Sequence, residues 1–209
     1  MTGGGPPLVA ALTQAPSPLW YFARASGLVS LVLLTLTVAL GLALALRWRS
    51  VRWPLFISDG LHRYLGTVLF VFLAIHVITL WLDPFAKLNM ADVLVPFHSS
   101  YRPLWMGLGI CAGELSLALA LSVHLRKWIG YRTWRVMHYG TYATFPMAML
   151  HGVFAGSDSR TWWGLAIYGV CGLTVAGLVT ARMAGREPTS DRSPQPRADA
   201  LRLDSRPWS

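Results

Sequence analysis

Long apolar segments alternate with short polar ones along most of the chain. Four segments contain no Asp, Glu, Lys or Arg, namely 25–46, 64–82, 136–157 and 161–181. A fifth segment, 103–125, contains one such residue, Glu114. A helix needs about 20 mostly apolar residues to cross a hydrocarbon core of about 30 Å. Membrane strands would instead alternate in short segments. The pattern predicts an all-α integral membrane helix bundle of about five transmembrane helices, with neighbours antiparallel because their connections are short.

Composition supports the same class of protein. Charged residues make up only 13% of the chain, about half of the roughly 25% that is usual for soluble domains. This value excludes an ordinary soluble enzyme and a disordered chain. Cys111 and Cys171 form no CxxC, CxxCH or zinc-binding spacing, so neither a disulfide framework nor covalent haem attachment is predicted.

The net charge of +9 reflects membrane topology, because the basic residues stand between the apolar segments. We therefore expect membrane lipid as a partner and no nucleic acid. Nine Lys or Arg residues flank the first and third connections and the end of the last segment, against four on the other side. The positive-inside rule places the N-terminus outside and the C-terminus in the cytoplasm, for a multi-pass protein of the plasma (cell inner) membrane.

The two ends of the chain differ in composition from the apolar part. Residues 1–19 are rich in Gly and Pro and have no basic n-region, so they predict an extracytoplasmic segment rather than a cleavable signal peptide. Residues 20–183 form the predicted membrane domain. Residues 184–209 are polar and rich in Pro and Arg, which predicts a disordered cytoplasmic tail too short for a flavin or nicotinamide domain.

Four histidines lie at the ends of two apolar spans, where ionisable residues are costly and mark function. His62 and His76 are 14 residues apart, at the two ends of the second span, and His138 and His151 are 13 apart, at the two ends of the fourth. These two helices run parallel, since one antiparallel helix separates them. At about 1.5 Å per residue, the members of each pair are roughly 20 Å apart in depth. His62 and His138 should share the cytoplasmic level, and His76 and His151 the outer level.

Two histidines that face each other at one depth are the axial ligands that a six-coordinate haem iron needs. The two levels predict two non-covalent b-type haems, with the metal ligands His62 and His138 at one level and His76 and His151 at the other. Arg63 and Arg135, with Arg132, lie at the inner level and could pair with haem propionates, although topology alone also explains them. Small residues near the histidines would let a porphyrin approach the backbone; these are Gly66, Gly140 and Gly152.

The 13-residue spacing is a geometric problem for this hypothesis. At about 100° per residue, 14 steps return to within about 40° of the same helix face, whereas 13 steps miss it by about 140°. Pro146 lies between His138 and His151, and proline kinks or rewinds a helix. We therefore expect a distorted fourth helix, or ligation of the two haems from different sides of it.

The histidine pattern, HRYLG at 62–66 and GYRTWRVMHYGTYATFPMAMLHG at 130–152 together resemble the ferric reductase-like transmembrane domain family. That family includes the membrane cores of NADPH oxidases and ferric-chelate reductases, and the haem-binding subunit of bacterial methionine sulfoxide reductase. The resemblance covers about residues 20–182. It implies that His62 with His138, and His76 with His151, bind two haems that pass cytosolic electrons to an external acceptor such as ferric chelate.

The resemblance implies a redox subunit of an oxidoreductase, with no catalytic residue identified and with electrons from a separate flavoprotein or from quinol. Two alternatives stay open. The chain could be the haem-binding membrane anchor of a periplasmic, methionine sulfoxide reductase-like enzyme with an external reductase subunit, or a haem-free membrane scaffold whose histidines only pack. Glu114, near the middle of a predicted span, is a candidate for proton relay or haem tuning. His98 and His124 are expected to be solvated and interfacial.

Overall fold

The computed structural model describes residues 16–46 and 55–184, and these residues form helices and no strands. The long helices are α2 (Pro18–Ala45), α3 (Leu55–Leu82), α5 (Pro103–Ile129) and α8 (Trp162–Ala184). The shorter elements are α4 (Met90–Leu94), α6 (Tyr131–His138), α7 (Thr141–Ala155) and the 3₁₀ turn η1 (Asp158–Arg160). The sequence prediction of an all-α protein is therefore confirmed for the described residues.

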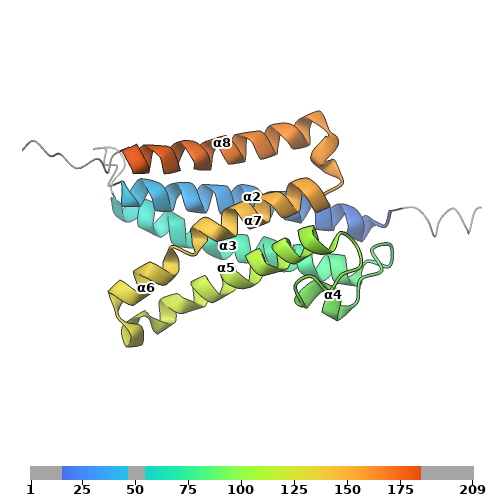
Figure 1. Cartoon of the computed structure of the whole chain (residues 1–209), viewed down its shortest axis with the longest axis horizontal. Coiled ribbons are helices and arrows are strands. Elements are labelled where there is room, and N and C mark those ends of the chain that lie inside the picture. Colours follow the sequence, from blue (N-terminus) through green and yellow to red (C-terminus); the bar gives the residue numbers. More distant parts are fainter. Residues whose placement is uncertain (1–15, 47–54, 185–209) are drawn as a thin grey trace, which may run out of the picture.

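Helix α2 occupies the middle of the bundle, with α3, α7 and α8 against it and α5 packed on α7 (Figure 1). Buried apolar side chains of α2, α3, α7 and α8 form one core cluster. It consists of Leu31, Leu34, Val38 and Leu42 on α2, Leu69 on α3, Phe145 on α7, and Tyr168, Cys171 and Val175 on α8. Ser30 and Thr35 on the same helix are buried too, and each hydroxyl donates to a carbonyl four residues earlier. Because these polar groups are satisfied inside the helix, α2 can be central without an unpaired donor.

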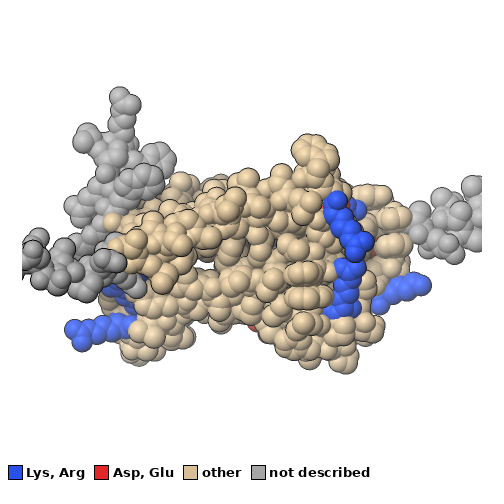
Figure 2. Space-filling view, turned by 45° about the horizontal axis from the view of Figure 1, so that its top comes forward, with Lys and Arg blue, Asp and Glu red and all other residues tan. Residues whose placement is uncertain are grey.

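Four helices are long and apolar enough to cross a membrane, namely α2, α3, α5 and α8 among the described residues. Many large apolar side chains on these helices are exposed, including Val71, Leu117 and Leu173. Figure 2 shows Lys and Arg gathered toward the two ends of the bundle, with a broad band free of Lys and Arg between them. Basic residues at the two ends and an apolar band between them are typical of a multi-pass membrane protein in contact with lipid.

The predicted fourth segment, residues 136–157, is not one continuous helix. Its first residues belong to α6, and after a break at Tyr139 and Gly140 the chain continues as the 15-residue α7 (Figure 1). A helix of this length extends about 22 Å, less than the roughly 30 Å of a hydrocarbon core. The second helix also differs from expectation, because it begins at Leu55 and therefore places His62 inside the helix rather than at its end.

The distortion expected between His138 and His151 lies at Tyr139 and Gly140, whereas Pro146 stays inside α7. The amide N–H groups of Tyr139, Gly140, Tyr142 and Ala143 each donate to the carbonyl three residues earlier. Such 3₁₀-type winding advances about 120° per residue rather than 100°. Four such residues recover about 80° of the 140° mismatch, so the tightened turn more than halves the geometric problem of the 13-residue spacing.

Three of the sequence expectations lie outside the described residues. They concern the N-terminal segment up to residue 15, the basic first connection at 47–54 and the tail from residue 185. The ends of α2, α5 and α8 and the beginning of α3 gather at one end of the bundle (Figure 1). We call this the inner end, and the opposite end, with α4 and η1, the outer end.

Candidate functional site

The structure brings the four intramembrane histidines together in two pairs, one toward each end of the bundle. The ring centroids of His62 and His138 are 6.3 Å apart, with 71° between the ring planes. Those of His76 and His151 are 6.4 Å apart, with 76° between the planes. These are the two pairs that helix depth predicts. Each pair joins α3 to the α6–α7 segment, so both levels are built by the same two parts of the chain.

The spacing of the rings fits an iron bound between two imidazoles. With metal–nitrogen bonds of about 2.0–2.1 Å and each nitrogen about 1.1 Å from its ring centre, the two centroids stand about 6.2–6.4 Å apart. Among the described residues, no three His, Cys, Asp or Glu side chains gather to hold a metal. The donor set therefore suits haem, which needs only two ligands from the protein because the porphyrin supplies the other four.

Three of the four rings are held by a hydrogen bond from Nδ1 to a backbone carbonyl on a neighbouring helix. His62 bonds to the carbonyl of Thr37 at 2.9 Å, and His76 to that of Ala23 at 2.7 Å. On the other side of the outer pair, His151 bonds to the carbonyl of Trp105 at 2.9 Å. Because a carbonyl can only accept, Nδ1 carries the proton in each ring, which leaves the lone pair of Nε2 free for a metal.

The fourth ring, His138, is held differently. It stacks on Trp134, with 5.0 Å between ring centroids and 25° between the planes. Its Nδ1 is buried and has no hydrogen-bond partner among the described residues, and the same is true of Nε1 of Trp134. The inner pair therefore has one ring fixed by a helix backbone and one fixed only by packing.

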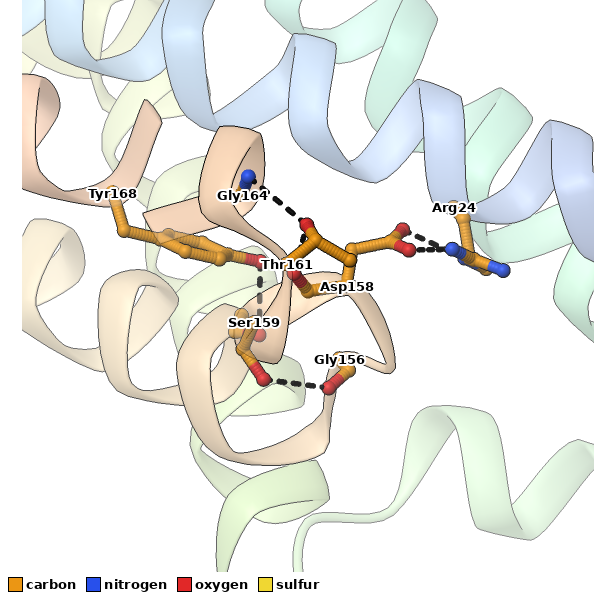
Figure 3. A network of polar contacts seen from close by, with 8 residues as sticks. Arg24, Gly156, Asp158, Ser159, Thr161, Gly164 and Tyr168 are labelled. Carbon is orange, nitrogen blue, oxygen red and sulfur yellow. Dashed lines mark hydrogen bonds and ion pairs between the residues drawn. The ribbon is translucent and has the colours of Figure 1, made fainter. Parts of the chain in front are cut away.

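The end of α7 beside His151 is secured by a network of polar contacts (Figure 3). Nε of Arg24 on α2 donates to Oδ2 of Asp158 at 2.7 Å, and the two side chains form an ion pair. The hydroxyl of Tyr168 on α8 donates to the carbonyl of Gly152, 2.9 Å away. These contacts tie the connection between α7 and α8 to α2, and so fix the residue next to His151.

The arginines predicted to meet propionates are both exposed and already interact with neighbouring side chains. Arg63 forms an ion pair with Asp59 at 3.1 Å, one turn earlier on α3. Arg135 makes a side-chain hydrogen bond with Tyr139, which raises the pKa of its guanidinium. The structure therefore places both residues on the surface of the inner end, and their role toward haem stays a prediction.

A cavity of about 360 Å³ opens at the outer end, between the beginning of α5 and the α7–α8 connection. Its lining includes Arg102, Arg160, Ser157 and Phe154. The Phe154 ring stacks on Trp105, with 4.2 Å between centroids, and the Trp105 carbonyl holds His151. Arg102 and Arg160 are two of the four basic residues on the outer side, and nothing in the sequence shows that the two segments meet.

A smaller cavity of about 190 Å³ lies at the inner end and is lined by Tyr139, Tyr142, Val179, Arg182 and Met183. Arg182 is only 9% exposed, although its sequence position indicated no more than the end of a span. This cavity adjoins the inner pair through Tyr139, the residue after His138.

The remaining polar residues singled out by the sequence do not join either pair. Glu114, His98 and His124 are exposed. Gly66 faces open space, and Gly152 contacts the ring of Tyr168. The glycines that do contact histidine rings lie on other helices.

Comparison with known proteins adds no relative from which a role could be transferred: no protein-family model, no curated protein and no solved structure matches the chain.

Proposed function

We propose that the chain is a di-haem b-type cytochrome of the plasma membrane, related to the ferric reductase-like transmembrane proteins. It carries electrons from a cytoplasmic flavoprotein or from quinol to an external acceptor such as ferric chelate. The observation that carries the proposal is the pair of facing imidazoles at each level, with centroid spacings of 6.3 and 6.4 Å. Rings that only pack edge to face stand anywhere between about 4.5 and 7 Å apart, whereas both pairs here have the spacing that an intervening iron requires.

The proposed topology has five crossing segments, with α7 and the end of α6 as the fourth. The N-terminus is outside and the C-terminus cytoplasmic, because Arg and Lys are more numerous at the inner end. In this orientation, His62 and His138 serve the cytoplasmic level, and His76 and His151 serve the external level.

Bound haem supplies a one-electron iron couple at each level. Nε2 of each histidine would bind the haem iron, and in three of the four rings the Nδ1 hydrogen bond fixes the orientation of the ring. The four histidines are partly buried, and α2, α3, α7 and α8 share an apolar core. Lipid covers the exposed apolar side chains of the same helices.

The cavity with Arg102 and Arg160 supports an acceptor that approaches from the outer end. Among the described residues, the lining contains Arg102 and Arg160 and no acidic residue, and Asp158 in the same connection is paired with Arg24, so the cavity lining has a net positive charge. A positively charged lining attracts anionic acceptors, among which chelates of ferric iron with carboxylic acids are a natural class. Trp105 and Phe154 connect this cavity to His151 by direct contacts.

The test is a dithionite-reduced minus oxidised visible spectrum of the full chain after haem-replete expression, with haem quantified per chain. Sharp b-type bands with about two haems per chain are expected from bis-histidine ligation at two levels. A chain that folds and purifies without any Soret absorption would show that the histidines only pack, as in a scaffold. Reduction of the bound haem by quinol but not by a flavoprotein would identify the donor.

A further inference from the structure

Each of the three anchored histidine rings lies on a glycine of the neighbouring helix. Cβ atoms built on Gly27 and Gly41 would lie 2.9 and 3.3 Å from Cε1 of His76 and His62, respectively. A Cβ on Gly109 would lie 2.5 Å from Cγ of His151. Real Cβ contacts essentially never fall below 3.0 Å, so two of these three positions exclude any side chain while the ring stays in place.

The three glycines share one relationship to the carbonyls that accept the Nδ1 hydrogen bonds. Gly41 follows Thr37 by four residues, Gly27 follows Ala23 by four, and Gly109 follows Trp105 by four. In an α-helix the carbonyl of residue i accepts the N–H of residue i+4, whose Cβ is tilted back toward the same carbonyl. A glycine at i+4 leaves the second lone pair of that carbonyl open to an outside donor.

The spacing along α2 matches the spacing along α3. The two acceptor carbonyls of α2 are 14 residues apart, as are its two glycines and as are His62 and His76. Fourteen residues are close to four turns, so both receiving positions lie on one face of α2 and both rings on one face of α3. The α2–α3 pair thus repeats the same contact at the two levels.

We propose that Gly27, Gly41 and Gly109 are ligand-positioning residues, which expose a helix carbonyl so that each imidazole is held in its Nδ1–H form. The inference rests on the proposed haem function for its purpose, but the hydrogen-bonded tautomer is a property of the protein itself. His138 is not held in this way, because its Nδ1 has no acceptor among the described residues.

The three glycine positions differ in how closely a Cβ would approach the histidine ring. The built Cβ overlaps the ring most at Gly109, less at Gly27 and least at Gly41, where the ring need give way by only a few tenths of an ångström. A change from glycine to alanine ordinarily favours a helix by about 0.5–1 kcal/mol. A loss of haem in these variants would therefore report the blocked ring rather than a weaker helix.

The first experiment measures haem per chain and the ferric low-spin signal in Gly109→Ala, Gly27→Ala and Gly41→Ala. Gly169→Ala and Gly177→Ala are matched controls in α8, because a Cβ there meets nothing within 4 Å. We expect haem affinity to fall about 10–100-fold, as when a second-shell partner is removed. The loss of haem should be confined to the outer level in Gly109→Ala and Gly27→Ala. In Gly41→Ala it should be smaller and at the inner level, and the controls should lose no haem. Full retention of the outer haem with an unchanged signal in Gly109→Ala and Gly27→Ala would overturn the proposal.

The second experiment needs no substitution and no haem. Nitrogen-15 chemical shifts of histidine-labelled full chain, purified without haem, distinguish the Nδ1–H from the Nε2–H tautomer. Three of the four intramembrane rings should be in the Nδ1–H form, as the hydrogen bonds require. Nε2–H forms at these rings would refute the positioning role even if haem binds, whereas Nδ1–H forms in a chain that never binds haem would refute only the proposed function.

Discussion

The imidazoles of His76 and His151 face each other 6.4 Å apart, centroid to centroid, although 75 residues separate them in the chain. One ring is fixed to α2 through Ala23 and the other to α5 through Trp105. The outer level is thus held from two opposite helices, and the pair is set before any ligand enters.

Loss of one histidine should empty one level and leave the other. In His76→Ala we expect about one of two haems to remain, because an axial position is lost only at the outer level. His62→Ala should give the converse result at the inner level. Haem quantification together with redox titration checks this, since the remaining haem should titrate as a single component. Retention of both haems in both variants would refute the ligand assignment.

The ring planes predict a spectroscopic signature. The planes of the two rings differ by 71° at one level and 76° at the other. Imidazoles at nearly right angles interact with different iron dπ orbitals and leave these orbitals almost equal in energy. The oxidised protein should therefore show strongly anisotropic low-spin ferric signals in electron paramagnetic resonance. The rhombic signals of parallel imidazoles at both levels would contradict the observed geometry.

Neutralising the outer cavity should discriminate between acceptors by charge. In Arg160→Gln, prereduced protein should reduce ferricyanide about three- to tenfold more slowly at low salt, because one attracting charge is lost. Reduction of the cationic acceptor hexaammineruthenium(III) should not slow. Stopped-flow oxidation of the haem bands measures both rates, and Lys127→Gln, at an exposed basic residue in the last turn of α5, serves as a control. Equal slowing of both acceptors would exclude electrostatic recognition.

Removing one partner of the ion pair between Arg24 and Asp158 should destabilise the fold, because the other partner is left as an unpaired charge. The side chain of Asp158 is 9% exposed and that of Arg24 is 28% exposed, so either partner alone would be a poorly solvated charge. Breaking a buried ion pair costs about 3–5 kcal/mol of folding free energy. Because Arg24 is partly exposed, we expect a loss near the lower end of this range. Thermal unfolding in detergent should show a larger decrease for Asp158→Ala than for the double variant Arg24→Ala with Asp158→Ala.

Trp134 offers a test of the inner level. Trp134→Phe keeps an aromatic ring against His138 but removes a buried N–H that has no partner among the described residues. Removing an unsatisfied donor is neutral or stabilising, so melting temperature and inner haem content should not fall. Trp134→Ala should lower both, because the stacking contact that holds the His138 ring is lost.

Much of the bundle could be predicted from the sequence, because long apolar segments and the positions of Arg and Lys are local properties of the chain. The break at Tyr139 and Gly140 was only partly predictable. The 13-residue spacing between His138 and His151 predicts that a regular helix cannot point both rings to one side. The sequence indicates Pro146 as the site of the distortion. The structure instead tightens the turn near Gly140, and Pro146 continues inside α7.

The sequence by itself determined an all-helical membrane protein with two depths of paired histidines, since segment length and residue spacing fix which residues share a level. Only the tertiary structure decided which groups hold the rings. The glycines singled out from the sequence lie beside the histidines on their own helices, whereas Gly27, Gly41 and Gly109 act across a helix–helix contact. Such a contact depends on how two helices are rotated against each other. That rotation results from packing of the whole bundle, which no local pattern in the chain specifies.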